Sequence, residues 1–255
     1  MPFVQSHKPT KLRFSLIGYL VVDLKSVIPL VGALMHDPVL ARPPLSGLWL
    51  DQLADGLAGP GWMWLDAREQ LGTGLLSGLQ SEVETLQQAE VMREAGIGRG
   101  QDLVHDRGIR RDRIAWLDGK TAVQAELFRF LELLQEGLNR RLYLNLRRFE
   151  AHYASYGEGD FYRCHLDSFR GRASRVVSLV LYLNDNWLAT DGGELQLYDP
   201  NSPELECARL PPEMGHLALF LSEEVPHEVL PANRKRHSIA CWFRQDEVPV
   251  PLTGL

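Results

Sequence analysis

The spacing of apolar residues changes near residue 142, and this change limits the possible folds more than any other feature. Residues 120–142 carry apolar side chains at intervals of three and four, which predicts a helix packed on one face. Later stretches alternate at intervals of two, are rich in β-branched and aromatic residues, and are separated by turn formers: 176–184, 194–198, 216–221, 227–230 and 237–243. Helices followed by strands predict an α+β fold, with N-terminal helices that buttress one face of a double-stranded β-helix, or jelly roll.

The part of the chain before residue 120 divides into segments of different character. Residues 14–35 are rich in apolar side chains, but charged residues interrupt them before they reach the roughly 18–20 apolar residues of a membrane helix. No clear cleavage site of an export signal follows. Residues 36–46 contain three prolines and are typical of a linker. Residues 75–92 predict a further helix, and the glycine- and arginine-rich residues 96–116 predict a mobile loop or ribbon outside the core.

Charge and cysteine content exclude several classes of protein. The formal net charge is −6, which argues against a nucleic-acid or membrane-surface partner. The three cysteines, Cys164, Cys207 and Cys241, are an odd number and far apart, so neither a disulfide scaffold nor a zinc ribbon fits. We therefore expect a cytoplasmic protein.

Two histidines and one aspartate form the strongest candidate for a chemical site. His165 and Asp167 are two residues apart, so on a strand both side chains point to the same face and hold one ion together. His227 supplies a third ligand from a later strand. Two imidazoles and one carboxylate on one side of an ion are the facial triad of non-heme Fe(II) oxygenases, which leaves three coordination positions open. The His-x-Asp pattern alone is common by chance, so the residues after His227 carry the argument.

Arg236 follows His227 by nine residues. A hairpin that turns at residues 231–233 would place Arg236 on the neighbouring strand, roughly opposite His227. A buried guanidinium beside a metal needs an anionic partner, and its fork matches a carboxylate. A dicarboxylate such as 2-oxoglutarate would bind the metal at one end and Arg236 at the other.

This pattern resembles the 2-oxoglutarate/Fe(II)-dependent dioxygenases of the prolyl 4-hydroxylase group, and within it the bacterial branch of the hypoxia-factor-type prolyl hydroxylases. The resemblance covers roughly residues 53–245, so we expect a dioxygenase domain at 46–255 and an N-terminal extension at 1–45. Beyond the metal ligands and Arg236, the similarity lies in four stretches: Ile109–Lys120, Tyr182–Asn184, Gly192–Leu195 and Pro226–Val229.

The resemblance implies a role for each matching residue. His165, Asp167 and His227 would hold Fe(II). Arg236 and Tyr182 would bind the distal carboxylate of 2-oxoglutarate, and Tyr156 would also contact this co-substrate. The substrate-binding positions of the family fall on Arg110, Asp112 and Arg175. Alternation along a ribbon places Arg110 and Asp112 on one face, where their opposite charges can pair.

The implied reaction is hydroxylation of a prolyl residue in a protein, with O2 consumed, succinate and CO2 released, and ascorbate as the expected reductant. An aspartate at position 167 favours hydroxylation, since halogenating relatives have a small residue there. By analogy with bacterial relatives, the substrate is a translation factor such as elongation factor Tu.

Three alternatives remain open. A free amino-acid or small-molecule hydroxylase of the same superfamily would not need the arginine-rich loop. A nucleic-acid dealkylase of the AlkB-like branch would have a second arginine where this chain has Trp242. A non-catalytic cupin-like binding module would not need the complete triad with Arg236.

Overall fold

The computed structural model describes residues 44–96, 104–168 and 175–246. All of these residues belong to one compact unit, Pro43–Leu255. The apolar segment 14–35, most of the linker 36–46 and residues 97–103 of the expected loop lie outside the described residues. Within the described part of the chain, no helix has the length and apolar character that crossing a bilayer requires.

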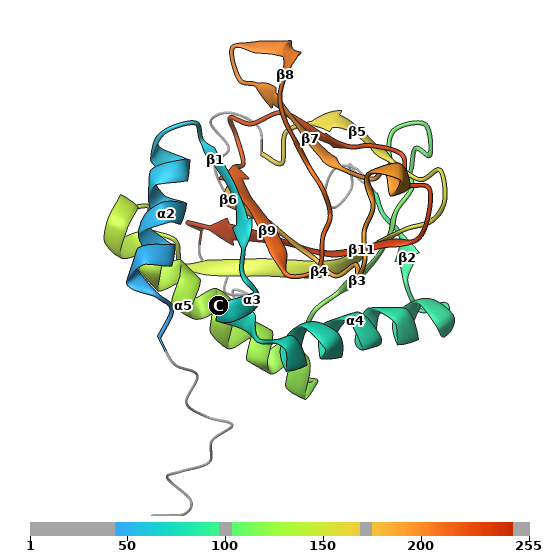
Figure 1. Cartoon of the computed structure of the whole chain (residues 1–255), viewed down its shortest axis with the longest axis horizontal. Coiled ribbons are helices and arrows are strands. Elements are labelled where there is room, and N and C mark those ends of the chain that lie inside the picture. Colours follow the sequence, from blue (N-terminus) through green and yellow to red (C-terminus); the bar gives the residue numbers. More distant parts are fainter. Residues whose placement is uncertain (1–43, 97–103, 169–174, 247–255) are drawn as a thin grey trace, which may run out of the picture. The chain divides into compact units, whose positions relative to one another are not determined.

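The core consists of two antiparallel sheets (Figure 1). The larger sheet has seven strands in the order β1-β9-β6-β11-β4-β3-β2, and the smaller has four in the order β5-β10-β7-β8. The strands of the larger sheet are β1 (Trp62–Asp66), β2 (Arg93–Glu94), β3 (Arg113–Trp116), β4 (Arg148–Tyr156), β6 (Arg175–Tyr182), β9 (His216–Leu221) and β11 (Arg236–Arg244). Those of the smaller sheet are β5 (Tyr162–His165), β7 (Leu195–Asp199), β8 (Ser202–Leu210) and β10 (His227–Val229).

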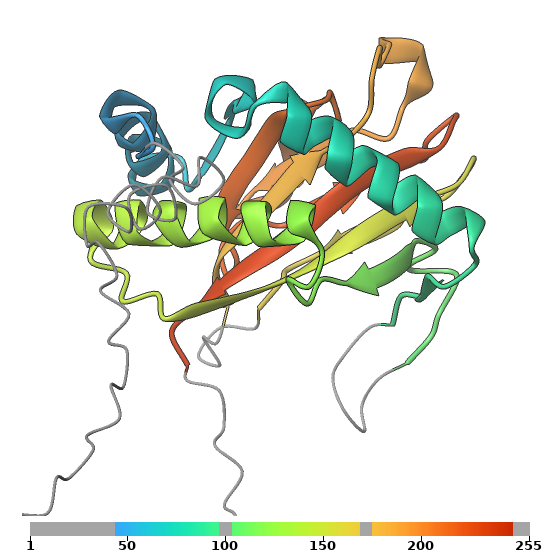
Figure 2. The ribbon, with the colours of Figure 1, turned by 90° about the horizontal axis from the view of Figure 1, so that it is seen from below.

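Helices cover one face of the larger sheet (Figure 2). The longest is α5 (Ala122–Leu142), which begins where the Thr121 side chain accepts a hydrogen bond from the Gln124 N–H and ends at Tyr143 in a left-handed conformation. It packs with α2 (Gly47–Ala58) and α4 (Thr73–Gln88), and the short α3 (Arg68–Leu71) precedes α4. Their apolar faces form one hydrophobic core with the sheet.

The other face of the larger sheet packs against the smaller sheet. Strand β6 shows how one strand serves both cores, because Val177, Leu179 and Leu181 face the helices while Val180 and Tyr182 face the smaller sheet. This burial of both faces explains why β6 is apolar along nearly its whole length. A single polar residue, Ser178, interrupts its central run.

The structure agrees with the predicted helices at 75–92 and 120–142 and with the five predicted strands, which correspond to α4, α5, β6, β7, β9, β10 and β11. It corrects the prediction for residues 96–116. The end of this segment is strand β3, which pairs with β4, and Asp112 just before it is 1% exposed. The segment thus enters the sheet instead of staying outside the core.

Candidate metal centre

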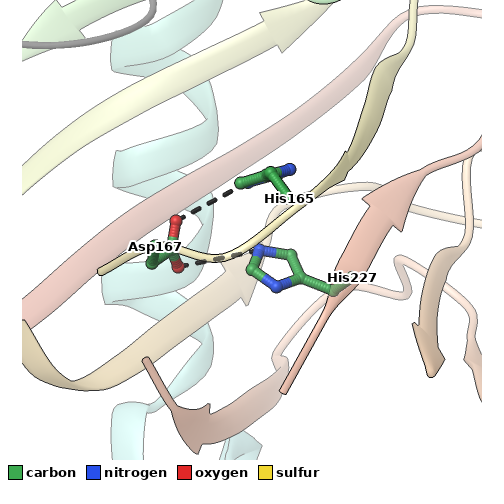
Figure 3. Close-up of side chains that lie close together, drawn as sticks. All are labelled: His165, Asp167 and His227. Atoms are coloured by element: carbon green, nitrogen blue, oxygen red, sulfur yellow. Dashed lines mark ion pairs between the residues drawn. The ribbon is translucent and has the colours of Figure 1, made fainter. Parts of the chain in front are cut away.

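The three predicted ligands lie close together, with their side chains pointing toward one another, and all three line one cleft (Figure 3). One ligand atom each from His165, Asp167 and His227 falls within 4.8 Å of the others. His165 Nε2 lies 3.6 Å from Asp167 Oδ1, and His227 Nε2 lies 3.6 Å from Asp167 Oδ2. This arrangement of two imidazoles and a carboxylate fits one transition-metal ion.

The two histidines lie in paired strands, which fix their positions, but the aspartate lies outside any strand. His165 ends β5 and His227 begins β10, where the two are paired directly across the ladder. Asp167 lies two residues beyond the end of β5, so the alternation expected from the sequence does not orient it. Its carboxylate is held instead by the Ser178 hydroxyl, which donates a hydrogen bond of 2.6 Å to Oδ2.

Both imidazoles are held in the tautomer that a metal requires. His165 Nδ1 lies 2.7 Å from the Arg163 carbonyl oxygen, and His227 Nδ1 lies 3.0 Å from that of Val225. A carbonyl oxygen only accepts hydrogen bonds, so each Nδ1 carries a proton, and in the neutral ring Nε2 is then the nitrogen with a lone pair for a metal. Such backbone partners commonly orient metal-binding histidines.

Electrostatics keep His227 and Asp167 in their metal-binding protonation states at neutral pH. Burial lowers the pKa of His227 to about 4, and the neighbouring His165 adds to this effect. Burial by itself would raise the pKa of Asp167, but His227, His165 and the Ser178 hydrogen bond together hold it well below its usual range. His227 is therefore neutral and Asp167 is ionised.

A buried arginine lies in the same cleft. Arg236 is 1% exposed, and it donates from Nε to the Gly193 carbonyl at 2.8 Å and from Nη1 to Ser238 Oγ at 3.1 Å. Its remaining nitrogen, Nη2, has no hydrogen-bond partner among the described residues, and neither does the hydroxyl of the buried Tyr182. The Arg236 guanidinium lies 4.9 Å from the ring centre of Tyr156 and 5.3 Å from that of Tyr182.

These unpaired donors fit the distal carboxylate of a dicarboxylate. A buried cation without an anion is costly, and a carboxylate would accept from both Nη2 and the tyrosine hydroxyl. The route by which Arg236 reaches the cleft differs from the prediction. Strands β10 and β11 do not form a hairpin, because β10 belongs to the smaller sheet and β11 to the larger, where Arg236 pairs with Tyr156.

The metal ligands and Arg236 line one cleft of about 1400 Å³. Seven of the nine predicted site residues line it: His165, Asp167, His227, Arg236, Tyr156, Arg110 and Arg175. Tyr182 and Asp112 do not line it, but each contacts a residue that does: the Tyr182 ring contacts the Arg236 guanidinium, and Asp112 pairs with Arg110. The cleft is far larger than a metal ion and a five-carbon acid need, so a larger molecule can enter it.

The predicted pair of Arg110 and Asp112 is present and nearly buried. Arg110 Nε lies 2.6 Å from Asp112 Oδ1 and Nη2 lies 2.9 Å from Oδ2, a two-point contact. The Arg110 guanidinium lies over the Tyr162 ring at 4.5 Å, and that ring stacks on His165 at 3.6 Å. Arg110 is therefore connected to the predicted metal ligand His165 through the ring of Tyr162.

Arg175 occupies the opposite end of the cleft from Arg236. It donates to Glu150 at 2.7 Å, and its guanidinium carbon lies over the Trp242 ring, 3.7 Å from the ring centre. Trp116 belongs to the same wall, and the sequence prediction missed it. Trp116 is 57% exposed and lies next to Trp242, so the two rings form an aromatic surface that a bound molecule can contact.

Sequence reasoning also missed Ser178, which holds Asp167. The sequence does contain a feature that points to Ser178. It is the one polar residue in the apolar run 176–181, and it lies on the same strand face as Tyr182. An isolated polar residue on a buried face needs a partner, and here the partner is Asp167.

Comparisons with known proteins agree with this geometry. Residues 151–244 match the model of the 2OG-Fe(II) oxygenase superfamily. A structure of a prolyl-4-hydroxylase from Pseudomonas putida is 36% identical, with a TM-score of 0.69 over 76% of this chain and 98% of that one. A Trichoplax adhaerens prolyl hydroxylase, in complex with a hypoxia inducible factor peptide fragment, is 28% identical, with a TM-score of 0.70 over 78% of this chain and 90% of that one.

A further relative is also a prolyl hydroxylase, and it matches this chain over a shorter region. The hypoxia-inducible factor prolyl hydroxylase of Caenorhabditis elegans is 31% identical over 153 residues. The match covers 56% of this chain but only 21% of the nematode protein. This chain therefore matches only about a fifth of the length of the nematode protein, and the rest of that protein has no counterpart in this match.

Proposed function

Because this chain belongs to the 2OG-Fe(II) oxygenase superfamily, we propose that it hydroxylates a prolyl residue of a protein, using Fe(II), 2-oxoglutarate and O2. The observation that carries the proposal is the presence, in one cleft, of a three-ligand metal site and a buried arginine with an unpaired nitrogen. The similarity to two prolyl hydroxylase structures supports proline as the target. We assign the oxygenase domain to residues 46–255 and regard 1–45 as an extension.

We assign different roles to the side chains that line the cleft. His165, Asp167 and His227 would hold the iron, and Arg236 with Tyr182 would bind the distal carboxylate of 2-oxoglutarate beside Tyr156. When bound, iron and 2-oxoglutarate react with O2 to hydroxylate an unactivated C–H bond, with release of succinate and CO2. The fixed position of the buried Arg236 would select a dicarboxylate of matching length, and its burial would keep water from the resulting ion pair.

A protein substrate suits the dimensions and the walls of the cleft. The volume of about 1400 Å³ extends from the metal site to the aromatic wall of Trp116 and Trp242, where Arg175 lies. We propose that Arg110, Asp112 and Arg175 contact or shape the bound polypeptide. Elongation factor Tu is our first candidate, by analogy with bacterial relatives, and the free thiols of all three cysteines are compatible with a cytoplasmic setting.

An assay of the purified protein tests the proposal. The protein is incubated with Fe(II), ascorbate and 2-oxoglutarate, and succinate is measured with candidate proteins, free proline or no substrate. We expect succinate formation to rise with a proline-containing protein, and mass spectrometry to find one added oxygen atom on a proline. Stimulation by free proline alone would favour a small-molecule hydroxylase, and no succinate under any condition would favour a non-catalytic binding module.

The unknown substrate is found by comparing proteomes of the host with and without the gene. A peptide that carries one extra oxygen on proline only when the protein is present identifies the target. A host proteome without any such difference would contradict the proposed substrate class.

The pair of Arg110 and Asp112 gives a prediction about substrate binding. Asp112→Lys places two cations in a site where the Asp112 side chain is 0% exposed, and breaking a buried pair costs about 3–5 kcal/mol. We expect loss of protein hydroxylation with survival of the slow, substrate-free turnover of 2-oxoglutarate, measured as succinate. Equal loss of both activities would mean that the change reaches the metal ligand through Tyr162 and His165.

Glu94→Lys is the matched control for this variant. Glu94 lies in β2 and also lines the cleft, but its pair with Arg107 is exposed on both sides, so reversal of this charge costs little stability. We expect it to keep most protein hydroxylation. If both variants lose hydroxylation to the same extent, the charge of the loop and not the buried pair is responsible.

A further inference from the structure

Two buried hydroxyl groups lie behind the metal site. Ser178 Oγ is 2.6 Å from Asp167 Oδ2 and 2.8 Å from Ser222 Oγ. Ser178 is 1% exposed and Ser222 is fully buried. We propose that Ser178, supported by Ser222, is a positioning residue that holds Oδ2 of Asp167 and leaves Oδ1 as the one carboxylate oxygen for the metal.

The chemistry of the three groups fixes the direction of their hydrogen bonds. An ionised carboxylate only accepts, so Ser178 donates its single hydroxyl hydrogen to Asp167. The hydroxyl of Ser178 then has no hydrogen left for Ser222, so Ser222 must be the donor in their contact. The chain runs from Ser222 to Ser178 to Asp167, and each bond polarises the next.

Asp167 needs such an anchor because the strand does not provide one. Strand β5 ends at His165, so no ladder hydrogen bond fixes the backbone of Asp167. The next residue, Ser168, donates its backbone N–H to the Ser222 carbonyl at 3.1 Å, and the Ser222 N–H donates to the Val176 carbonyl at 3.0 Å. Ser222 therefore holds this segment at two points, through the backbone of Ser168 and through the hydroxyl chain to Asp167.

The anchor has a consequence for coordination. A carboxylate that binds a metal through both oxygens occupies two coordination positions. A carboxylate that binds through one oxygen occupies one. With Oδ2 engaged by Ser178, the triad takes three positions and leaves three open. This inference rests on the metal site of the proposed function, but not on the identity of the substrate.

Titration of the full chain with Mn(II) alone tests the inference, with free Mn(II) measured by electron paramagnetic resonance. We expect Ser178→Ala to raise the Kd for Mn(II) by about 10–100-fold, as loss of a partner of a metal ligand typically does. Ser222→Ala should give a smaller rise, because Ser178 still donates to Asp167. Ser178→Thr should return the Kd close to the wild-type value, since it keeps the hydroxyl and the cleft has room for its methyl group.

Ser155→Ala is the matched control. Ser155 is also a buried serine of the larger sheet, but its hydroxyl has no hydrogen-bond partner among the described residues, so its removal should leave the Kd unchanged. An unchanged Kd in Ser178→Ala, an equal rise in Ser155→Ala, or a failure of threonine to restore binding would each overturn the positioning role. So would a metal-free unfolding midpoint of Ser178→Ala far below that of Ser155→Ala. Absence of Mn(II) binding by the wild-type protein would instead refute the metal site itself.

Discussion

Asp167→Ala is expected to abolish 2-oxoglutarate-dependent turnover, with a loss of more than about 100-fold, because even partners of metal ligands are worth about 10–100-fold. The variant removes the only carboxylate of the three-ligand group and leaves two imidazoles, which hold Fe(II) poorly. It also leaves the Ser178 hydroxyl without its acceptor. Succinate formation and Mn(II) affinity measure the two effects.

The control for this variant is Asp51→Ala. Asp51 is an exposed carboxylate on α2 that pairs with Arg141, on the helical side of the molecule. We expect its turnover and its Mn(II) affinity to remain those of the wild type. Full turnover in Asp167→Ala would remove the assignment of the triad.

Arg236→Ala is expected to raise the apparent KM for 2-oxoglutarate by well over tenfold. The variant leaves one end of a dicarboxylate unpaired in a buried site, at a cost of about 2–5 kcal/mol. Mn(II) affinity should not change, since Arg236 forms its hydrogen bonds with Gly193 and Ser238 and with none of the three ligands. The measurement is succinate formation at increasing 2-oxoglutarate, alongside the Mn(II) titration.

Two further variants sharpen this prediction. Arg236→Lys keeps a positive charge but loses the two-point fork, so its KM should lie between those of the wild type and the alanine variant. Arg234→Ala removes a partly exposed arginine that lies over Trp187, outside the main cleft, and should leave the KM unchanged. A KM in Arg236→Ala equal to that of the wild type would contradict the role of Arg236.

The sequence predicts the elements whose pattern is local. Strand β6 and helix α5 have long, regular runs of apolar residues, and the structure has both within two residues of the predicted bounds. Strands β1 and β8 were missed for different reasons. Strand β1 is a short apolar stretch that pairs with β9 about 150 residues later, and β8 begins with serine, proline and glutamate and lies at a sheet edge.

For the site too, the sequence predicts what depends on local spacing but not what depends on contacts between distant residues. The order and spacing of the residue types, together with the family resemblance, predicted the three ligands and Arg236, and the structure brings these four side chains to one cleft. The reason that spacing suggested was wrong for two of them, since Asp167 is oriented by Ser178 and Arg236 enters from the other sheet. Which sheet a strand joins depends on contacts between distant residues, and local periodicity does not contain that information.

Strand β11 joins the two ends of the cleft with a single stretch of backbone. Arg236, Ser238, Ala240 and Trp242 all line it, and the first and last lie six residues apart, or roughly 20 Å at about 3.3 Å per residue. Insertion or deletion of one residue here would move every later side chain to the opposite face of the sheet, so substitution is the change that keeps this lining of the cleft in place. Substitution of Ala240 offers a way to change the size of the molecules that the cleft accepts. A bulkier side chain at this position would narrow the cleft between Arg236 and Trp242 and so favour smaller substrates.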